Sequence, residues 1–247
     1  MRIFLTECKR CALEIKAYSA GYISEMLMTV IIFFGLMQGL GDHSKSYYLT
    51  FIYWYLASGI ISNGSISTSQ EKQTGTLQQL LLKPVSFLKI ITYRNIFWLG
   101  FSLFQILFVI LIGVLTIHLK LYFDVKIILI GFSLFIALQG LGYIITSMTI
   151  KTAKIGNFVS IISYILLFTS GGVVPSSNLP KVIQWTNNFQ PLALAIKATK
   201  SIIDYDRTPV DLIIRLIFIS VIYFILGLLI YKKIYKSGKK YGIDNNY

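Results

Sequence analysis

The chain has 247 residues, of which 55% are hydrophobic, 15% aromatic and 13% charged, and its formal net charge is +13. Soluble domains carry roughly 25% charged residues, and several apolar runs here exceed the ~18 uncharged residues that indicate a membrane span. These features exclude an ordinary soluble domain. The positive charges cluster at the ends of the apolar runs, which favours lipid headgroups over nucleic acid as their partner.

Residues 2–17 predict an amphipathic helix that lies on the membrane surface within segment 1–18. Its apolar residues gather on one side and its charged residues largely on the other. The alternative is a polar segment that leads into the first span. Cys8 and Cys11 share one helical face, but zinc needs further ligands, and His43 and His118 lie in other loops. We therefore expect no metal site.

The apolar runs predict an all-α polytopic membrane protein with a single transmembrane domain over residues 1–247. The expected spans cover residues 20–40, 47–66, 93–117, 125–148, 156–170 and 211–231. Lysine and arginine are more frequent in the segments that lie inside when the N-terminus is inside. We therefore expect six spans with both termini in the cytoplasm and a frayed, basic tail over residues 232–247.

A polar stretch, residues 69–88, separates the second and third expected spans. Leu77, Leu80 and Leu81 recur at spacings of three and four, which predicts one apolar face of a short helix. Gly75 is expected to bend the chain before this helix, and Pro84 to end it. The charge distribution places this short helix on the cytoplasmic side, where a soluble partner can reach it.

A second irregular region, residues 171–208, precedes the last expected span. Two short helices are expected there, the first with Pro180 in its first turn and the second beginning at Pro191. Neither is long enough to cross a bilayer, so we expect a re-entrant region on the outer side that is covered by other parts of the protein. Gly171, Gly172 and Pro175 lie at its start.

No enzyme signature is present in the sequence, because it lacks a nucleotide-binding loop, a histidine–carboxylate cluster and a Gly-x-Ser-x-Gly elbow. Polar residues inside spans are the remaining candidates for function. Glu25 is expected either to pair with a basic neighbour or to contact substrate. Asn63, Gln105 and Gln139 are expected either to hydrogen-bond between helices or to line a translocation path.

Two motifs together resemble the type 2 ABC-transporter permease family, the membrane subunits of exporters. The stretch Glu71-x-x-x-Gly75-Thr76-Leu77-x-x-Leu80-Leu81 followed by Pro84-Val85-Ser86 resembles the coupling-helix motif of that family. The sequence Gly171-Gly172-Val173-Val174-Pro175, with Leu179-Pro180 and Pro191-Leu192, resembles its outer re-entrant region. The family often has an acidic residue after Gly-Thr-Leu, where this chain has Gln78.

The resemblance implies a permease subunit without its own ATPase site that moves an amphiphilic substrate outward by alternating access. A separate ABC ATP-binding subunit would bind ATP and Mg²⁺ and would dock on Glu71, Gly75, Thr76, Leu77, Leu80 and Leu81. A second permease copy, identical or different, would complete a dimer in the bacterial cell membrane.

Other functions remain open at this point. Permeases of similar size export polysaccharide or teichoic acid chains, and a membrane scaffold that moves nothing is a further alternative. An importer permease fits less well, because its Glu-Ala-Ala type loop is missing from the sequence.

Overall fold

The computed structural model describes residues 2–39, 46–82, 85–151, 155–174 and 176–241. These parts of the chain form helices and connecting segments, without a strand among them. The elements, in chain order, are α1 (Arg2–Ala17), α2 (Ser19–Gly39), α3 (Tyr47–Gln73), α4 (Thr76–Leu82), α5 (Phe87–Ile117), α6 (Val125–Lys151), α7 (Gly156–Thr169), the 3₁₀ turn η1 (Ser176–Asn178), α8 (Lys181–Thr186), α9 (Pro191–Ile203) and α10 (Val210–Tyr241). Pro84 and Pro175 lie outside the described residues, as does most of the expected loop 41–46.

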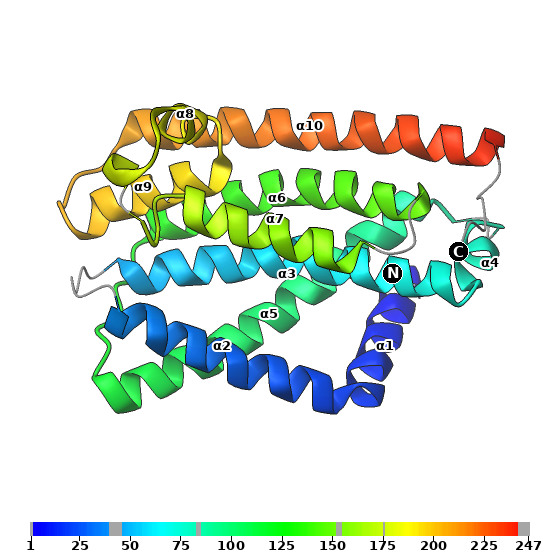
Figure 1. Ribbon diagram of the computed structural model, residues 1–247, viewed down its shortest axis with the longest axis horizontal. Helices are drawn as coiled ribbons and strands as arrows, with labels where there is room; N and C mark the ends of the chain where they lie inside the picture. Colours follow the sequence, from blue (N-terminus) through cyan, green and yellow to red (C-terminus); the bar gives the residue numbers. More distant parts are fainter. Residues whose placement is uncertain (1, 40–45, 83–84, 152–154, 175, 242–247) are drawn as a thin grey trace.

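The long helices run along one axis of the molecule (Figure 1). α3, α6, α7 and α10 lie along this axis, and α5 runs obliquely across it. α1, α4 and the C-terminal end of α10 lie at one end, whereas α8 and α9 lie at the other. This arrangement separates the two regions that the sequence singled out, residues 69–88 and residues 171–208, by the length of the helices.

Within the described residues, four helices are long and apolar enough to cross a membrane: Ser19–Met37 of α2, Phe87–Ile117 of α5, Val125–Thr149 of α6 and Val210–Ser237 of α10. The chain is therefore a multi-pass membrane protein. α3 has 27 residues, but its C-terminal third is polar. α7 has 14 residues, so it is about 21 Å long, less than the ~30 Å of a bilayer core. The count of six spans thus remains a proposal.

The core is built around α3, α6 and α10. α3 packs against α5, α6 and α7, and α6 makes its most extensive pairing with α10. α6 and α10 approach closely because Gly140 faces Gly227 at their crossing, where a Cβ on Gly227 would lie within 2.7 Å of backbone atoms of Gly140. Small residues let helix backbones meet in this way inside membranes.

The orientation of α1 differs from the prediction. Its charged side was expected to face water, but Glu7 is only 6% exposed, whereas Leu5 and Leu13 are each 56% exposed. Glu7, Arg10 and Glu14 instead turn towards α3 and α5, where they find polar partners, whereas Lys9 and Lys16 are exposed. On the apolar side, Cys11 is fully buried and Leu5 is exposed. A surface helix in contact with lipid gains from this arrangement, because its apolar side chains meet hydrocarbon.

The region of residues 171–208 begins with a tight turn, in which Gly171 has a φ of +78° and a Cβ at Gly172 would overlap the Thr50 side chain. Pro191 opens α9 as expected, and residues 191–196 are buried. Pro180 precedes α8 as its N-cap rather than lying in its first turn.

The prediction that residues 232–247 form a frayed tail is partly wrong. α10 continues to Tyr241, because Tyr231 and Tyr235 pack against the body of the protein. Residues 242–247 lie outside the described residues.

Candidate functional site

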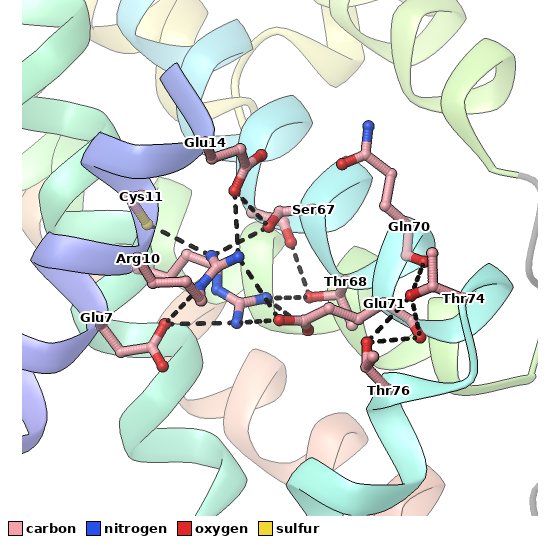
Figure 2. A network of polar contacts seen from close by, with 12 residues as sticks. Glu7, Arg10, Cys11, Glu14, Ser67, Thr68, Gln70, Glu71, Thr74 and Thr76 are labelled. Carbon is pink, nitrogen blue, oxygen red and sulfur yellow. Dashed lines mark hydrogen bonds and ion pairs between the residues drawn. The ribbon is translucent and has the colours of Figure 1, made fainter. Parts of the chain in front are cut away.

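The polar stretch 69–88 is divided among three helices rather than forming one unit. Residues 69–73 continue α3, because Ser69 and Lys72 are buried against neighbouring helices. The chain then turns at Gly75, whose φ of +75° favours glycine. The hydroxyl oxygens of Thr74 and Thr76 lie 3.2 Å from the Glu71 carbonyl oxygen (Figure 2) and hold this turn closed.

The short helix α4 is held against the rest of the protein by one apolar face. Leu77 is 1% exposed and belongs to a cluster with Phe87, Ile91, Tyr143 and Tyr231. Leu80 and Leu81 pack against the same cluster. Thr76, Gln78, Gln79 and Leu82 are exposed, with Leu82 85% exposed. α4 is thus a firmly seated helix that presents its other face to solvent.

Behind the turn, Arg94 of α5 is fully buried and binds Glu71 in a bidentate manner. Its Nη2 lies 2.9 Å from Glu71 Oε1, and its Nη1 donates to Glu71 Oε2 at 3.0 Å and to the Thr68 hydroxyl at 3.1 Å. Arg94 Nη2 also reaches Glu7 Oε2 of α1 at 3.4 Å. A guanidinium matches a carboxylate in this paired geometry, which fixes both position and direction.

α1 adds a second arginine to the same cluster. Arg10 lies 3.2 Å from Glu7, 3.1 Å from Glu14 and 3.6 Å from Glu71, and it donates to the Ser67 hydroxyl at 3.1 Å. Figure 2 shows these side chains of α1 converging with those of α3. The resulting charge cluster, defined here as Glu7, Arg10, Glu14, Glu71 and Arg94, ties α1, α3 and α5 together just before the turn into α4.

Two of the expected docking residues contact other parts of the chain. Glu71 turns towards Arg94 and Arg10, and Leu77 points into the core. Both hold the turn and α4 in position. The sequence patterns did not single out Arg94, because the third span was expected to begin at residue 93 and Arg94 would then lie at the membrane surface. α5 instead begins at Phe87, which places Arg94 two turns inside the helix.

The charge cluster and α4 lie within a region that matches a known family. The model of the ABC-2 type transporter family matches residues 4–203. The chain belongs to this family. Two relatives, both named "Probable multidrug ABC transporter permease YbhR", occur in Escherichia coli strain K12 and in Escherichia coli O157:H7. Each is 32% identical over 149 residues, which cover 58% of this chain and 39% of the relative. The match thus spans about two fifths of the relatives' length.

Three amide side chains of this ABC-2 family chain, those of Asn95, Gln105 and Gln139, join helices. The Tyr55 hydroxyl of α3 donates to Gln105 Oε1 of α5 at 2.9 Å. Asn95 Nδ2 of α5 donates to Gln139 Oε1 of α6 at 3.0 Å. Asn63 of α3 is half-buried beside Gly59 and Ser102. Such hydrogen bonds hold helices in register inside a membrane.

Glu25 of α2 lies apart from these contacts. Pairing with a basic neighbour was one expectation for it, but the described residues provide no ion pair or hydrogen bond to its carboxylate. It lines a cavity of about 320 Å³ between α2, α3 and α7, together with aromatic and serine side chains. Its environment therefore differs from that of Glu7, Glu14 and Glu71, which all face arginine.

We expect the two cysteines to differ in reactivity. Cys11 is fully buried, and burial raises the pKa of its thiol to about 11, so almost no thiolate is present at pH 7.5. Cys8 is half-buried; its pKa is raised mainly by burial and also by Glu7.

N-ethylmaleimide in the folded protein should modify Cys8 slowly and leave Cys11 untouched, as measured by mass spectrometry. Cys8→Ser is the control, and it should remain unlabelled until SDS is added. Labelling of folded Cys8→Ser would contradict the burial of Cys11.

Proposed function

We propose that this chain is the membrane-spanning permease subunit of an ATP-driven exporter. A separate ATP-binding subunit binds ATP and Mg²⁺ and docks on the exposed face of α4. The observation that carries this proposal is the construction of α4, which is seated by Leu77, is preceded by a closed turn at Gly75, and is connected to three other helices by the charge cluster. A helix held in this way transmits a displacement, whereas a flexible loop would absorb it.

The direction of force transmission follows from these contacts. A push on α4 reaches α3 through the turn at Gly75, and it reaches α5 and α1 through Arg94 and its two glutamates. It also reaches α6 and α10 through Tyr143 and Tyr231. Closure of the ATP-binding subunits would therefore tilt several helices together, which is the rigid movement that alternating access needs.

The proposed topology has six crossings, with α1, α4 and the end of α10 in or near the cytoplasm of a bacterial cell. The arrangement that supports it is the common position of these elements at one end of the molecule. The outer region that carries Gly171, Gly172, Pro180 and Pro191 lies at the other end. A second permease copy would complete the transporter, and lipid would surround the remaining apolar surface.

The docking surface can be tested with a charge placed on the exposed face of α4. Leu82→Asp combined with Gln79→Arg should abolish co-purification of the cognate ATP-binding subunit, because both side chains are exposed and lie on the side opposite Leu77. The measurement is the amount of ATP-binding subunit retained on the tagged permease, followed by ATP-dependent transport of an amphiphilic dye into inverted vesicles.

Val182→Asp on α8 is the matched control, because Val182 is 73% exposed and lies at the opposite end of the molecule. It should retain the ATP-binding subunit. Retention of that subunit by the α4 double variant, with transport intact, would show that α4 is not the docking element.

A further inference from the structure

A cavity lined by a carboxylate, hydroxyl groups and aromatic rings lies between three helices, each of which contributes one face. α2 provides Glu25 and Thr29, which are four residues apart. The other two helices provide residues at helical spacing, namely Trp54, Ser58 and Ser62 of α3 and Ser160, Ser163 and Tyr164 of α7. Its volume of about 320 Å³ falls within the range of roughly 300–1,000 Å³ of small-molecule sites.

Glu25 gives this cavity its charge. It is the one charged residue of α2, a 21-residue helix that is otherwise apolar or uncharged. Within the described residues, the three other glutamates bind arginine, whereas the Glu25 carboxylate has no ion pair or hydrogen bond. Glu25 lies in the second turn of α2, and its side chain is exposed in the chain alone. Within a membrane-spanning helix such a carboxylate needs a counter-charge or a proton. The cavity is the place where a counter-charge can arrive.

Aromatic walls face the same space and are held in fixed orientations. The Trp54 indole Nε1 donates to the Ser163 carbonyl oxygen at 2.9 Å, and its ring centre lies 6.2 Å from that of Tyr164. The Tyr55 hydroxyl is fixed by Gln105. Aromatic faces attract organic cations, above all quaternary ammonium groups, and tryptophan does so most strongly. Fixed rings lower the entropic cost of binding.

We propose that this cavity binds the cationic end of an amphiphilic substrate, with Glu25 as its counter-charge and Trp54 and Tyr164 as its aromatic walls. The inference rests on the proposed function and names the substrate class of that exporter. Met28 and Ile32, which lie on the cavity side of α2, would contact the apolar part of the ligand. The volume of about 320 Å³ accommodates a charged head with adjoining rings.

Two probes of equal shape and opposite charge test the proposal directly. Tetraphenylphosphonium and tetraphenylborate differ mainly in charge, and their binding to the purified permease–ATPase complex can be measured by equilibrium dialysis without ATP. The wild-type complex should bind the cation more tightly than the anion. Equal binding of the two probes, or preference for the anion, would overturn the proposal without any variant.

Variants of Glu25 test whether this carboxylate causes the preference for the cation. Glu25→Gln should weaken binding of the cation by about tenfold, the order of effect of losing one charge-assisted contact. Glu25→Lys should invert the preference towards tetraphenylborate. Ser24→Ala is the matched control, because Ser24 neighbours Glu25 but bonds to the Ala20 carbonyl oxygen and does not line the cavity. Unchanged cation binding by a folded Glu25→Gln variant, judged by size-exclusion chromatography, would contradict the role of Glu25.

The exporter function and the cation site can be contradicted separately. If the complex prefers the cation but transports no amphiphile when supplied with ATP, the exporter function is contradicted and the binding site is supported. If the complex shows no charge preference and transports amphiphiles equally well with Glu25→Gln, only the cation site is contradicted.

Discussion

Glu71→Gln should destabilise the protein by about 3 kcal/mol or more, because it leaves the Arg94 guanidinium buried without its main counter-charge. Arg94 is fully buried, and Glu71 supplies two of its four polar contacts. Glu7 at 3.4 Å remains as a weaker partner. The thermal midpoint of the purified permease, followed by differential scanning fluorimetry, should therefore fall clearly.

The matched control is Glu14→Gln, which removes a carboxylate from the other side of the same charge cluster. Its partner Arg10 has a side chain that is 31% exposed and keeps its contact with Glu7, so the loss should be about 1 kcal/mol or less. Equal losses from the two substitutions would contradict a special role for the buried Arg94–Glu71 pair.

A double variant separates stability from coupling. Arg94→Met with Glu71→Leu removes both charges, and hydrophobic replacement of a buried ion pair is often neutral or stabilising. We expect its thermal midpoint to recover towards the wild-type value. If the pair links α3 to α5 mechanically, ATP hydrolysis by the assembled complex should nevertheless proceed with little transport. Full recovery of transport would assign the pair to stability alone.

Four of the six expected spans correspond to described helices that are long and apolar enough to cross a membrane, namely α2, α5, α6 and α10, whereas the spans expected at α3 and α7 stay predictions. α2, α6 and α7 begin and end within about three residues of the expected bounds. α3 and α10 extend beyond their apolar runs, because polar side chains such as Ser69 and Lys72 become buried against neighbouring helices. The residue at which a helix ends depends on contacts with neighbouring helices, and hydropathy carries no information about these contacts.

The candidate site was predicted in outline from local signals. The spacing of Leu77, Leu80 and Leu81 and the bend at Gly75 are local properties, and the structure contains both the short helix and the positive φ. The partner of Glu71 was not predictable in the same way, because Arg94 lies on another helix, 23 residues away. Charge in a sequence shows that a partner is needed; only the packing of α1, α3 and α5 identifies it.

The α6–α10 crossing was likewise invisible in the sequence, because Gly140 and Gly227 lie on helices that are far apart along the chain. Together with the charge cluster, this crossing divides the protein into two linked parts. α1, α3 and α5 are joined by ion pairs, and α6 and α10 by close backbone packing. The Leu77 cluster, which includes Tyr143 of α6 and Tyr231 of α10, connects both parts to α4.

Gly227→Leu should separate α6 from α10 and lower stability by about 3 kcal/mol, the upper part of the range for overpacking in a core. A Cβ at this position would lie among the backbone atoms of Gly140, with Cα at 2.6 Å and C at 2.7 Å, and backbone cannot move aside as a flexible side chain can. Gly227→Ala should already lower the thermal midpoint for the same reason. Gly100→Ala on α5 is the control, because a Cβ there meets nothing within 4 Å, and its midpoint should stay the same or rise slightly.

Since α10 also carries Tyr231 to the Leu77 cluster, the Gly227 variants should loosen α4 and reduce retention of the ATP-binding subunit, although no residue of the docking face has changed. A Gly227→Leu protein with unaltered stability and full ATPase retention would show that the close crossing is dispensable for both.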